Sequence, residues 1–114
     1  MLKRQYRLRD RQSVAKVYRM GQTTRVGALS LRCRPNGMDT TRLAVVVSKK
    51  VAKSAPARNR IRRRLFETVR RKWPQITPGF DIIISVFEES IKSVPQEDID
   101  QLLDQLLNKA RLTS

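Results

Sequence analysis

The chain has 114 residues, of which 25 are Lys or Arg and 10 are Asp or Glu, and its formal net charge is +15. The length suits one domain around one core, and a hydrophobic content of 39% is enough to build that core, which argues against a disordered polycation. No apolar run approaches the roughly 18 residues of a membrane span.

The first predicted element is a short helix behind a basic arm. Residues 1–11 are basic and have no hydrophobic periodicity, which predicts a flexible arm. They also lack the apolar stretch of a secretory signal, so we expect a cytoplasmic protein. Val14, Val17 and Tyr18 then recur at helical spacing, which predicts a helix over residues 12–20.

Two strand patterns follow this helix. Residues 28–34 alternate apolar and polar side chains, as a half-buried strand does. Cys33 falls on the apolar side with Leu29 and Leu31, which favours a buried, unreactive thiol. Residues 42–48 include an unbroken apolar run, and this predicts a central strand buried on both faces.

Three more elements complete the domain. Apolar side chains recur every four positions and predict a docked helix over residues 57–73: Ile61, Leu65, Val69 and Trp73. Residues 80–86 are typical of a strand, residues 93–96 resemble a capping box, and an apolar stripe then predicts a last helix to residue 110. The order is αβββαβα if residues 23–34 form two strands and αββαβα otherwise. Either order is an α+β domain with helices packed on a sheet.

The run from residue 58 to residue 64 carries the strongest functional signal, because five of its seven residues are arginine. Opposite the apolar stripe of the predicted helix, basic side chains with one carboxylate among them form an outward face: Arg60, Arg63, Arg64, Arg70 and Arg71, with Glu67. Arg58 lies in the first turn. Arg62 lies over the apolar stripe, so it must extend past the stripe or reach a partner at the sheet edge. Such a face suits a polyanion, whose neutralised phosphates release counterions.

The charge is unevenly distributed along the chain. Residues 1–72 carry 22 basic and 3 acidic side chains, net +19, whereas residues 73–114 carry 3 basic and 7 acidic side chains, net −4. We therefore expect a basic surface over most of the fold and an acidic C-terminal segment turned away from the partner. Nucleic acid is favoured over a membrane surface, because the apolar residues are already assigned to a core.

Catalysis by the polypeptide alone is not indicated. The chain has no histidine, the commonest general base, and its four glycines are too scattered for a phosphate loop. Glu97, Asp100 and Asp104 share one face of the last helix. They could hold a metal, but a solvated helix face is the favoured interpretation.

Tyr18 suggests a second basic surface. Together with Arg32 and Arg34 on the strand it would combine an aromatic ring with positive charge, which suits single-stranded nucleic acid. Core packing of Tyr18 is the alternative. The aromatic strand signature of an RRM and the GXXG loop of a KH domain are both missing.

The arrangement around the arginine run resembles a known family. Ser48-Lys49-Lys50, seven residues, and then Arg58-Asn59-Arg60-Ile61-Arg62-Arg63 are similar to the RNR signature of the bacterial ribonuclease P protein subunit. The resemblance extends over roughly residues 5–90. It implies an αβββαβα two-layer sandwich with a mixed four-stranded sheet and a left-handed βαβ crossover, in a single RNA-binding domain over residues 1–114.

The resemblance also implies a function. Members bind a catalytic RNA and, together with it, remove the 5′ leader of precursor tRNA in a Mg²⁺-dependent cleavage. The RNA supplies the active site and holds most of the Mg²⁺, and one protein per RNA is expected. The implied contacts with the catalytic RNA are Lys49, Lys50, Lys53, Arg58, Asn59, Arg60, Arg62, Arg63 and Arg64. The implied contacts with the single-stranded leader are Val14, Tyr18, Arg32 and Arg34.

Three positions depart from the family pattern. An aromatic residue is usual where Val14 stands, and arginine is frequent where Phe66 and Phe87 stand. A structural RNA-binding protein such as a ribosomal protein is the rival interpretation, and the RNR spacing argues against it. A DNA-binding protein is a third, but the helix-turn-helix pattern is missing.

Overall fold

The computed structural model describes residues 3–113 and confirms the order αβββαβα. Residues 22–35 form two strands, so the longer of the two predicted orders is correct. The elements are α1 Arg11–Met20, β1 Gln22–Val26, β2 Leu29–Pro35, β3 Arg42–Val47, α2 Ala55–Lys72, β4 Phe80–Val86 and α3 Gln96–Lys109. Short 3₁₀ turns lie at η1 Arg4–Tyr6, η2 Trp73–Gln75 and η3 Glu89–Lys92.

The sheet has the order β1-β2-β4-β3. The pairs β1–β2 and β2–β4 are antiparallel, whereas β3 and β4 are parallel and α2 connects them. The prediction that residues 42–48 form a central strand buried on both faces is wrong, because β4 is central and β3 lies at the edge. Val46 on β3 is 39% exposed. The apolar run suggested burial on both faces, but one face of β3 packs under α2 while the other is only partly covered.

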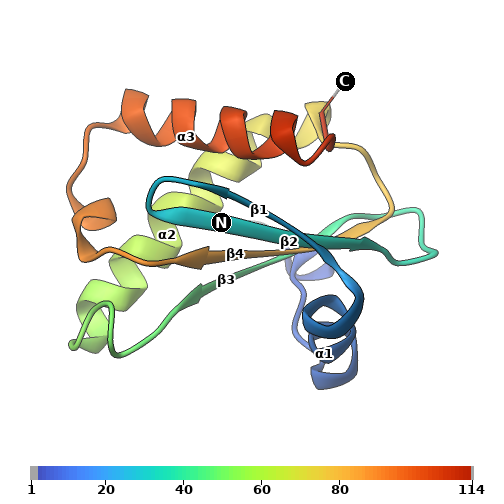
Figure 1. Cartoon of the computed structure of the whole chain (residues 1–114), viewed down its shortest axis with the longest axis horizontal. Helices are drawn as coiled ribbons and strands as arrows, with labels where there is room; N and C mark the ends of the chain where they lie inside the picture. Colours follow the sequence, from blue (N-terminus) through green and yellow to red (C-terminus); the bar gives the residue numbers. More distant parts are fainter. Residues whose placement is uncertain (1–2, 114) are drawn as a thin grey trace.

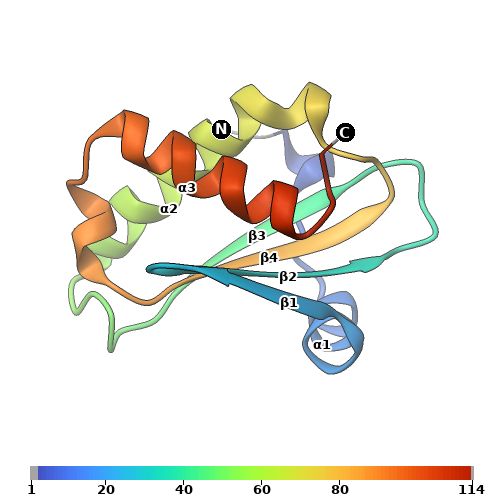
Figure 2. The same ribbon diagram turned by 45° about the horizontal axis from the view of Figure 1, so that its top comes forward.

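The sheet separates two layers of helix. Helices α2 and α3 cover one face and enclose the main core, and α1 lies against the other face (Figures 1 and 2). Alternation along β2 turns Leu29, Leu31 and Cys33 towards α2 and α3, and all three are buried. This confirms the predicted burial of Cys33. The same alternation turns Arg32 and Arg34 towards the layer of α1.

Side chains fix where the helices begin. The Asp10 carboxylate accepts a hydrogen bond from the Ser13 backbone N–H at 3.0 Å and caps α1. The Ser54 hydroxyl accepts from Ala57 N–H at 3.1 Å, and α2 begins at residue 55, two residues before the predicted start. The predicted capping box of α3 is wrong. Pro95 occupies the N-cap position, and the Gln96 amide donates instead to the Thr68 hydroxyl at 2.8 Å.

The N-terminal segment is docked on the edge of the sheet. Leu8 is 4% exposed, and its N–H donates to the carbonyl of Leu43 on β3 at 2.9 Å. The ring of Tyr6 lies 5.4 Å from that of Trp73. The prediction of a flexible arm is therefore wrong for residues 4–8, because these few apolar side chains find contacts far away in the sequence. Residues 1 and 2 of that arm lie outside the described residues.

Candidate nucleic-acid interface

The first turns of α2 present the basic run as a surface. Asn59, Arg60 and Arg63 are exposed, while Ile61 and Leu65 on the core-facing side of the helix are completely buried. Burial of the apolar stripe fixes the rotation of the helix, and this rotation turns the polar groups outward. Charged residues on a fixed helix give a pre-positioned phosphate-binding face.

A lysine-rich loop stands beside this face. Lys49, Lys50 and Lys53 are exposed, and buried Ala52 anchors the loop in the core. The guanidinium of Arg58 donates to the carbonyl of Ala52 at 3.0 Å and to that of Lys53 at 2.9 Å. Arg58 is only half-exposed, so it shapes the lysine loop in addition to the RNA contact predicted for it. The sequence showed that Arg58 could leave the apolar stripe but not what it would bind.

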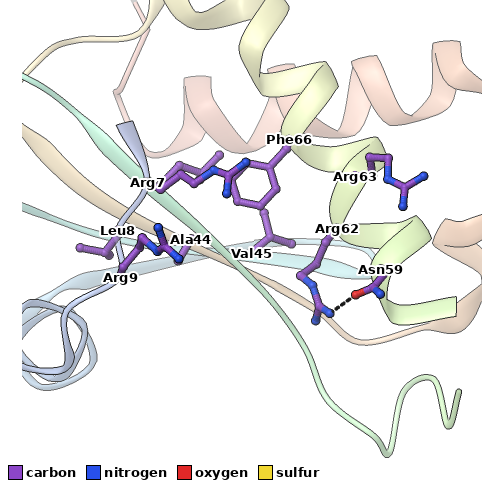
Figure 3. Close-up of a pocket in the computed structure, with 10 residues that line it drawn as sticks. Arg7, Leu8, Arg9, Ala44, Val45, Asn59, Arg62, Arg63 and Phe66 are labelled. Carbon is purple, nitrogen blue, oxygen red and sulfur yellow. Dashed lines mark hydrogen bonds between the residues drawn. The ribbon is translucent and has the colours of Figure 1, made fainter. Parts of the chain in front are cut away.

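Between α2 and the edge strand β3 lies a pocket of about 370 Å³ (Figure 3). Arg62 extends past the apolar stripe to this edge, and its guanidinium donates to the Asn59 side-chain carbonyl. The sequence allowed Arg62 either to extend past the apolar stripe or to reach a partner at the sheet edge, and the structure shows the first arrangement. The pocket is lined by Arg7, Leu8, Arg9, Leu43, Ala44, Val45, Asn59, Arg62, Arg63 and Phe66.

Arg7 and Arg9 belong to this interface although the sequence interpretation placed them in a flexible arm. The Arg7 guanidinium carbon lies 5.7 Å from the centre of the Phe66 ring. Its Nε is buried, and within the described residues it has no hydrogen-bond partner. The alternation of Tyr6 and Leu8 with arginines was the signal that could have revealed a docked segment. The Phe66 ring thus packs beside the guanidinium of Arg7.

Arg64 does not join the outward face. Its guanidinium donates to the carbonyl of Ile91 at 2.9 Å and to that of Val94 at 2.6 Å. It therefore holds the turn that leads into α3. The prediction of an outward side chain is wrong because position 64 lies on the flank of α2 that faces this turn. Its contact with RNA stays a prediction.

The surface around α1 carries the other predicted site. Tyr18 is 43% exposed, so the alternative of core packing is wrong. The Arg32 guanidinium lies 5.7 Å from the Tyr18 ring and donates to the Tyr18 carbonyl at 2.6 Å. The Arg32 guanidinium is thereby fixed near the Tyr18 ring, on the sheet face against which α1 lies. An exposed ring beside a fixed cation is suited to stacking on an unpaired base.

Val14 and Arg34 flank this pair. Val14 is half-buried and packs on the small core of Leu8, Val17 and Ile83 beneath α1. Arg34 is half-exposed and follows Arg32 on the same face of β2. The structure thus brings the four predicted leader contacts to one layer.

A buried ion pair positions α1 on the sheet. The Arg42 guanidinium donates to both carboxylate oxygens of Asp81, at 2.9 and 2.8 Å, and reaches Asp10 at the start of α1 at 3.3 Å. The hydrogen bond to Asp81 raises the pKa of Arg42 above its usual value. At Asp10, the hydrogen bonds from Ser13 lower the pKa of the carboxyl. Sequence reasoning missed this arrangement, because Arg42 and Asp81 lie 39 positions apart.

The acidic residues of α3 lie on the opposite side of the sheet from α1. On α3, Asp104 pairs with Lys72 at 2.8 Å and Asp100 with Arg71 at 3.7 Å. Within residues 3–113 no group of three His, Cys, Asp or Glu side chains could hold a metal ion. The acidic cluster therefore does not fit a Mg²⁺ site formed by protein alone. In the same range, no helix combines the length and apolar character required to cross a membrane.

Comparison with known proteins identifies relatives over nearly the whole chain. The family model described as Ribonuclease P matches residues 2–111. The ribonuclease P protein component of Roseiflexus castenholzii is 36% identical over 109 residues, covering 96% of this chain and 88% of the relative. That of a Pseudanabaena strain is 40% identical over 113 residues, covering 98% and 97%.

Solved structures agree in fold. The ribonuclease P protein of Thermotoga maritima is 30% identical and superposes with a TM-score of 0.81, covering 90% of this chain and 96% of that chain. The protein of Staphylococcus aureus gives a TM-score of 0.83 at 24% identity, with 96% and 98% covered. The second likeness concerns the fold alone, which confirms the mixed four-stranded sheet with helices on it.

Proposed function

This chain belongs to the ribonuclease P family as a protein component of that endoribonuclease and associates with its RNA, and we propose that two separate faces divide the binding. One face, formed by the lysine loop and the start of α2, binds the catalytic RNA. The other, formed by α1 and the open side of the sheet, binds the single-stranded 5′ leader of precursor tRNA.

The observation that carries the proposal is the exposure of Asn59, Arg60 and Arg63 beside the lysine loop. No carboxylate intervenes in the sequence from Lys49 to Arg64, so positive charge dominates this face. Arginine adds paired hydrogen bonds to phosphate that lysine cannot make. A folded RNA with closely spaced phosphates is the partner that this face fits.

The leader face works by a different chemistry. Tyr18 offers a ring for stacking, and Arg32 offers a cation fixed beside that ring. Stacking tolerates any base, so such a face holds a leader of varied sequence. Arg34 and Val14 extend the surface on either side.

The polypeptide contributes binding and positioning, and the RNA contributes the chemistry. Mg²⁺ would be held mainly by the RNA. Neutralising RNA phosphates at the interface lowers the repulsion between RNA and substrate, which lowers the Mg²⁺ that cleavage requires. One protein per catalytic RNA suffices for this role.

The test is cleavage of a precursor tRNA by a bacterial ribonuclease P RNA at low Mg²⁺. Adding the chain should restore leader removal that the RNA alone performs poorly, and the protein without RNA should release no leader. A Lys49→Ala/Lys50→Ala double variant, which removes two charges from the lysine loop, should restore less leader removal than the wild-type chain. Efficient leader removal by RNA-free protein would overturn the proposal, as would a chain that gives the RNA no advantage.

A further inference from the structure

A second arginine–aromatic pair lies on the same sheet face as Tyr18 and Arg32. The Arg25 guanidinium carbon lies 4.2 Å from the centre of the Phe87 ring, closer than the 5.7 Å between Arg32 and Tyr18. The pairing register aligns Arg25 with Ser30 on β2. Because paired residues share a face, Arg25 lies on the side of Arg32, two positions further along the hairpin.

The strand β4 places Phe87 on that face too. Ile83 on β4 pairs with Arg32, and side chains alternate along the strand, so Ser85 and then Phe87 point the same way. Phe87 lies four positions beyond Ile83, which at a rise of about 3.3 Å per residue is roughly 13 Å along the strand. The two aromatic pairs therefore stand at opposite ends of one face, because Tyr18 lies at the end that α1 covers (Figure 1).

Both members of the second pair are held in place by backbone hydrogen bonds. The Phe87 N–H donates to the Ala28 carbonyl at 2.8 Å, and Arg25 Nε donates to the Gly27 carbonyl at 3.2 Å. Phe87 is nevertheless 45% exposed, so it adds little to the core. An exposed aromatic on a fixed backbone, with a guanidinium on one face of its ring, can accept a base on the other face or in place of the guanidinium.

The surroundings favour RNA over a protein partner. Val47 and Val86 are paired, so Phe87 stands next to Ser48, where the lysine loop begins. Arg25 on β1 and Lys49 and Lys50 after β3 therefore lie towards the same end of the sheet. The carboxylates that follow Phe87 have partners of their own: Glu88 faces the Ser90 hydroxyl and Glu89 pairs with Lys92 at 3.4 Å.

Between the two pairs the face is open. Ser30 and Ser85 are half-exposed, and Val46 is 39% exposed. A stacked strand rises about 3.4 Å per nucleotide, so the roughly 13 Å between the ends of the face corresponds to about four nucleotides, or fewer if the strand is extended.

We propose that Arg25 and Phe87 form a second stacking site for single-stranded RNA, which receives a leader nucleotide two to four positions away from the one on Tyr18. This inference rests on the proposed leader-binding function. It assigns to this end of the face a base-stacking role through the aromatic ring, in addition to phosphate attraction by Arg25.

The test uses the complex of the chain with a bacterial ribonuclease P RNA and precursor tRNAs whose leaders are lengthened one nucleotide at a time. Phe87→Ala should weaken binding of long-leader substrates roughly 5- to 150-fold, the equivalent of one stacked base. Phe87→Tyr should retain most of the affinity, and Met38→Ala, which removes an exposed apolar side chain elsewhere, should change nothing. Because Phe87 is exposed, all these variants should melt at nearly the wild-type temperature.

The leader length decides between outcomes. The penalties of Phe87→Ala and Tyr18→Ala should appear at leader lengths that differ by two to four nucleotides. If only the Tyr18→Ala penalty depends on leader length, the second site is overturned and the leader face stands. If neither penalty depends on leader length, the proposed leader-binding function itself is overturned. An equal Phe87→Ala penalty for mature tRNA would assign Phe87 to another contact and overturn the inference.

Discussion

Arg42 and Asp81 form a two-pronged ion pair across the parallel strands β3 and β4, with only 17% and 4% of their side chains exposed. Asn36 also donates to the Asp81 carboxylate, at 2.9 Å. Through Asp10 and Ser13 the same guanidinium reaches the first turn of α1. In the strand register Asp81 pairs with Arg34 across β2 and β4, so the charge pair lies on the sheet face that we propose binds the leader, and the geometry of that face depends on it.

Removing one member of this pair should destabilise the fold strongly. Asp81→Ala leaves the Arg42 charge without its main partner, so we expect the free energy of unfolding to fall by about 3–5 kcal/mol. Urea denaturation followed by circular dichroism measures it. Glu89→Ala, which breaks the exposed pair with Lys92, is the control and should cost less than about 1 kcal/mol. Similar losses for the two variants would contradict a special role for Asp81.

Arg58 and Arg60 should separate stability from binding. Arg60 is exposed and should contribute to RNA affinity alone, whereas Arg58 also holds two loop carbonyls. Each change to alanine should weaken binding to the catalytic RNA by roughly 1–3 kcal/mol. Only Arg58→Ala should also lower the melting temperature, by the equivalent of about 1 kcal/mol. Filter binding and thermal denaturation of both variants test this, and equal melting temperatures would refute the supporting role of Arg58.

The periodicity of the sequence predicted most of the fold. The four-residue spacing of Ile61, Leu65 and Val69 located α2 and its buried side within two residues, because a helix face depends on local spacing alone. The edge position of β3 was not predictable in this way. An apolar run of strand length has the same appearance at a centre and at an edge, and long-range pairing decides between them.

The sequence predicted which residues form the basic surface but not which groups their side chains contact. Residue types and spacing identified the arginines of α2, but the partners of Arg64 are backbone carbonyls 27 and 30 positions away. Arg7 was assigned to a flexible arm because the contact that docks this segment, the hydrogen bond from Leu8 to Leu43 on β3, joins residues far apart in the sequence. Such contacts depend on tertiary structure, which hydrophobic periodicity does not encode.

Tyr18 should discriminate between precursor and mature tRNA. Its ring is 43% exposed, so Tyr18→Ala should leave the melting temperature nearly unchanged. Loss of one stacked base should weaken binding of precursor tRNA by about 1–3 kcal/mol, with mature tRNA and the catalytic RNA unaffected. Val17→Ala, at a fully buried neighbour, should instead lower the melting temperature. Equal losses for both tRNAs would rule out the leader contact.

Cys33 should be protected in the folded protein and should make stability fall at high pH. Burial raises the pKa of its thiol, so the folded state keeps the proton after the unfolded chain has lost it. The resulting stability is fully present below the unfolded thiol pKa and is lost as the pH rises through the folded value. Between pH 7 and about pH 10, Cys33→Ala should therefore lose less stability than the wild type in denaturant titrations. Alkylation of Cys33 in native protein should be much slower than in urea. Equal alkylation rates would contradict the buried position.

Salt should report how much of the binding is phosphate contact. With on the order of 6–10 neutralised phosphates, affinity for the catalytic RNA should fall by about 10³–10⁵ between 50 and 200 mM monovalent salt. Replacing one phosphate contact, as in Lys50→Ala, should reduce the slope of the log–log plot by about one. Phe87→Ala should weaken leader binding without changing the slope, because stacking on a neutral ring releases no counterion. Titrations of both variants beside the wild type test charge and stacking separately. A nearly flat plot for the wild type would mean that the lysine loop and α2 are not the interface.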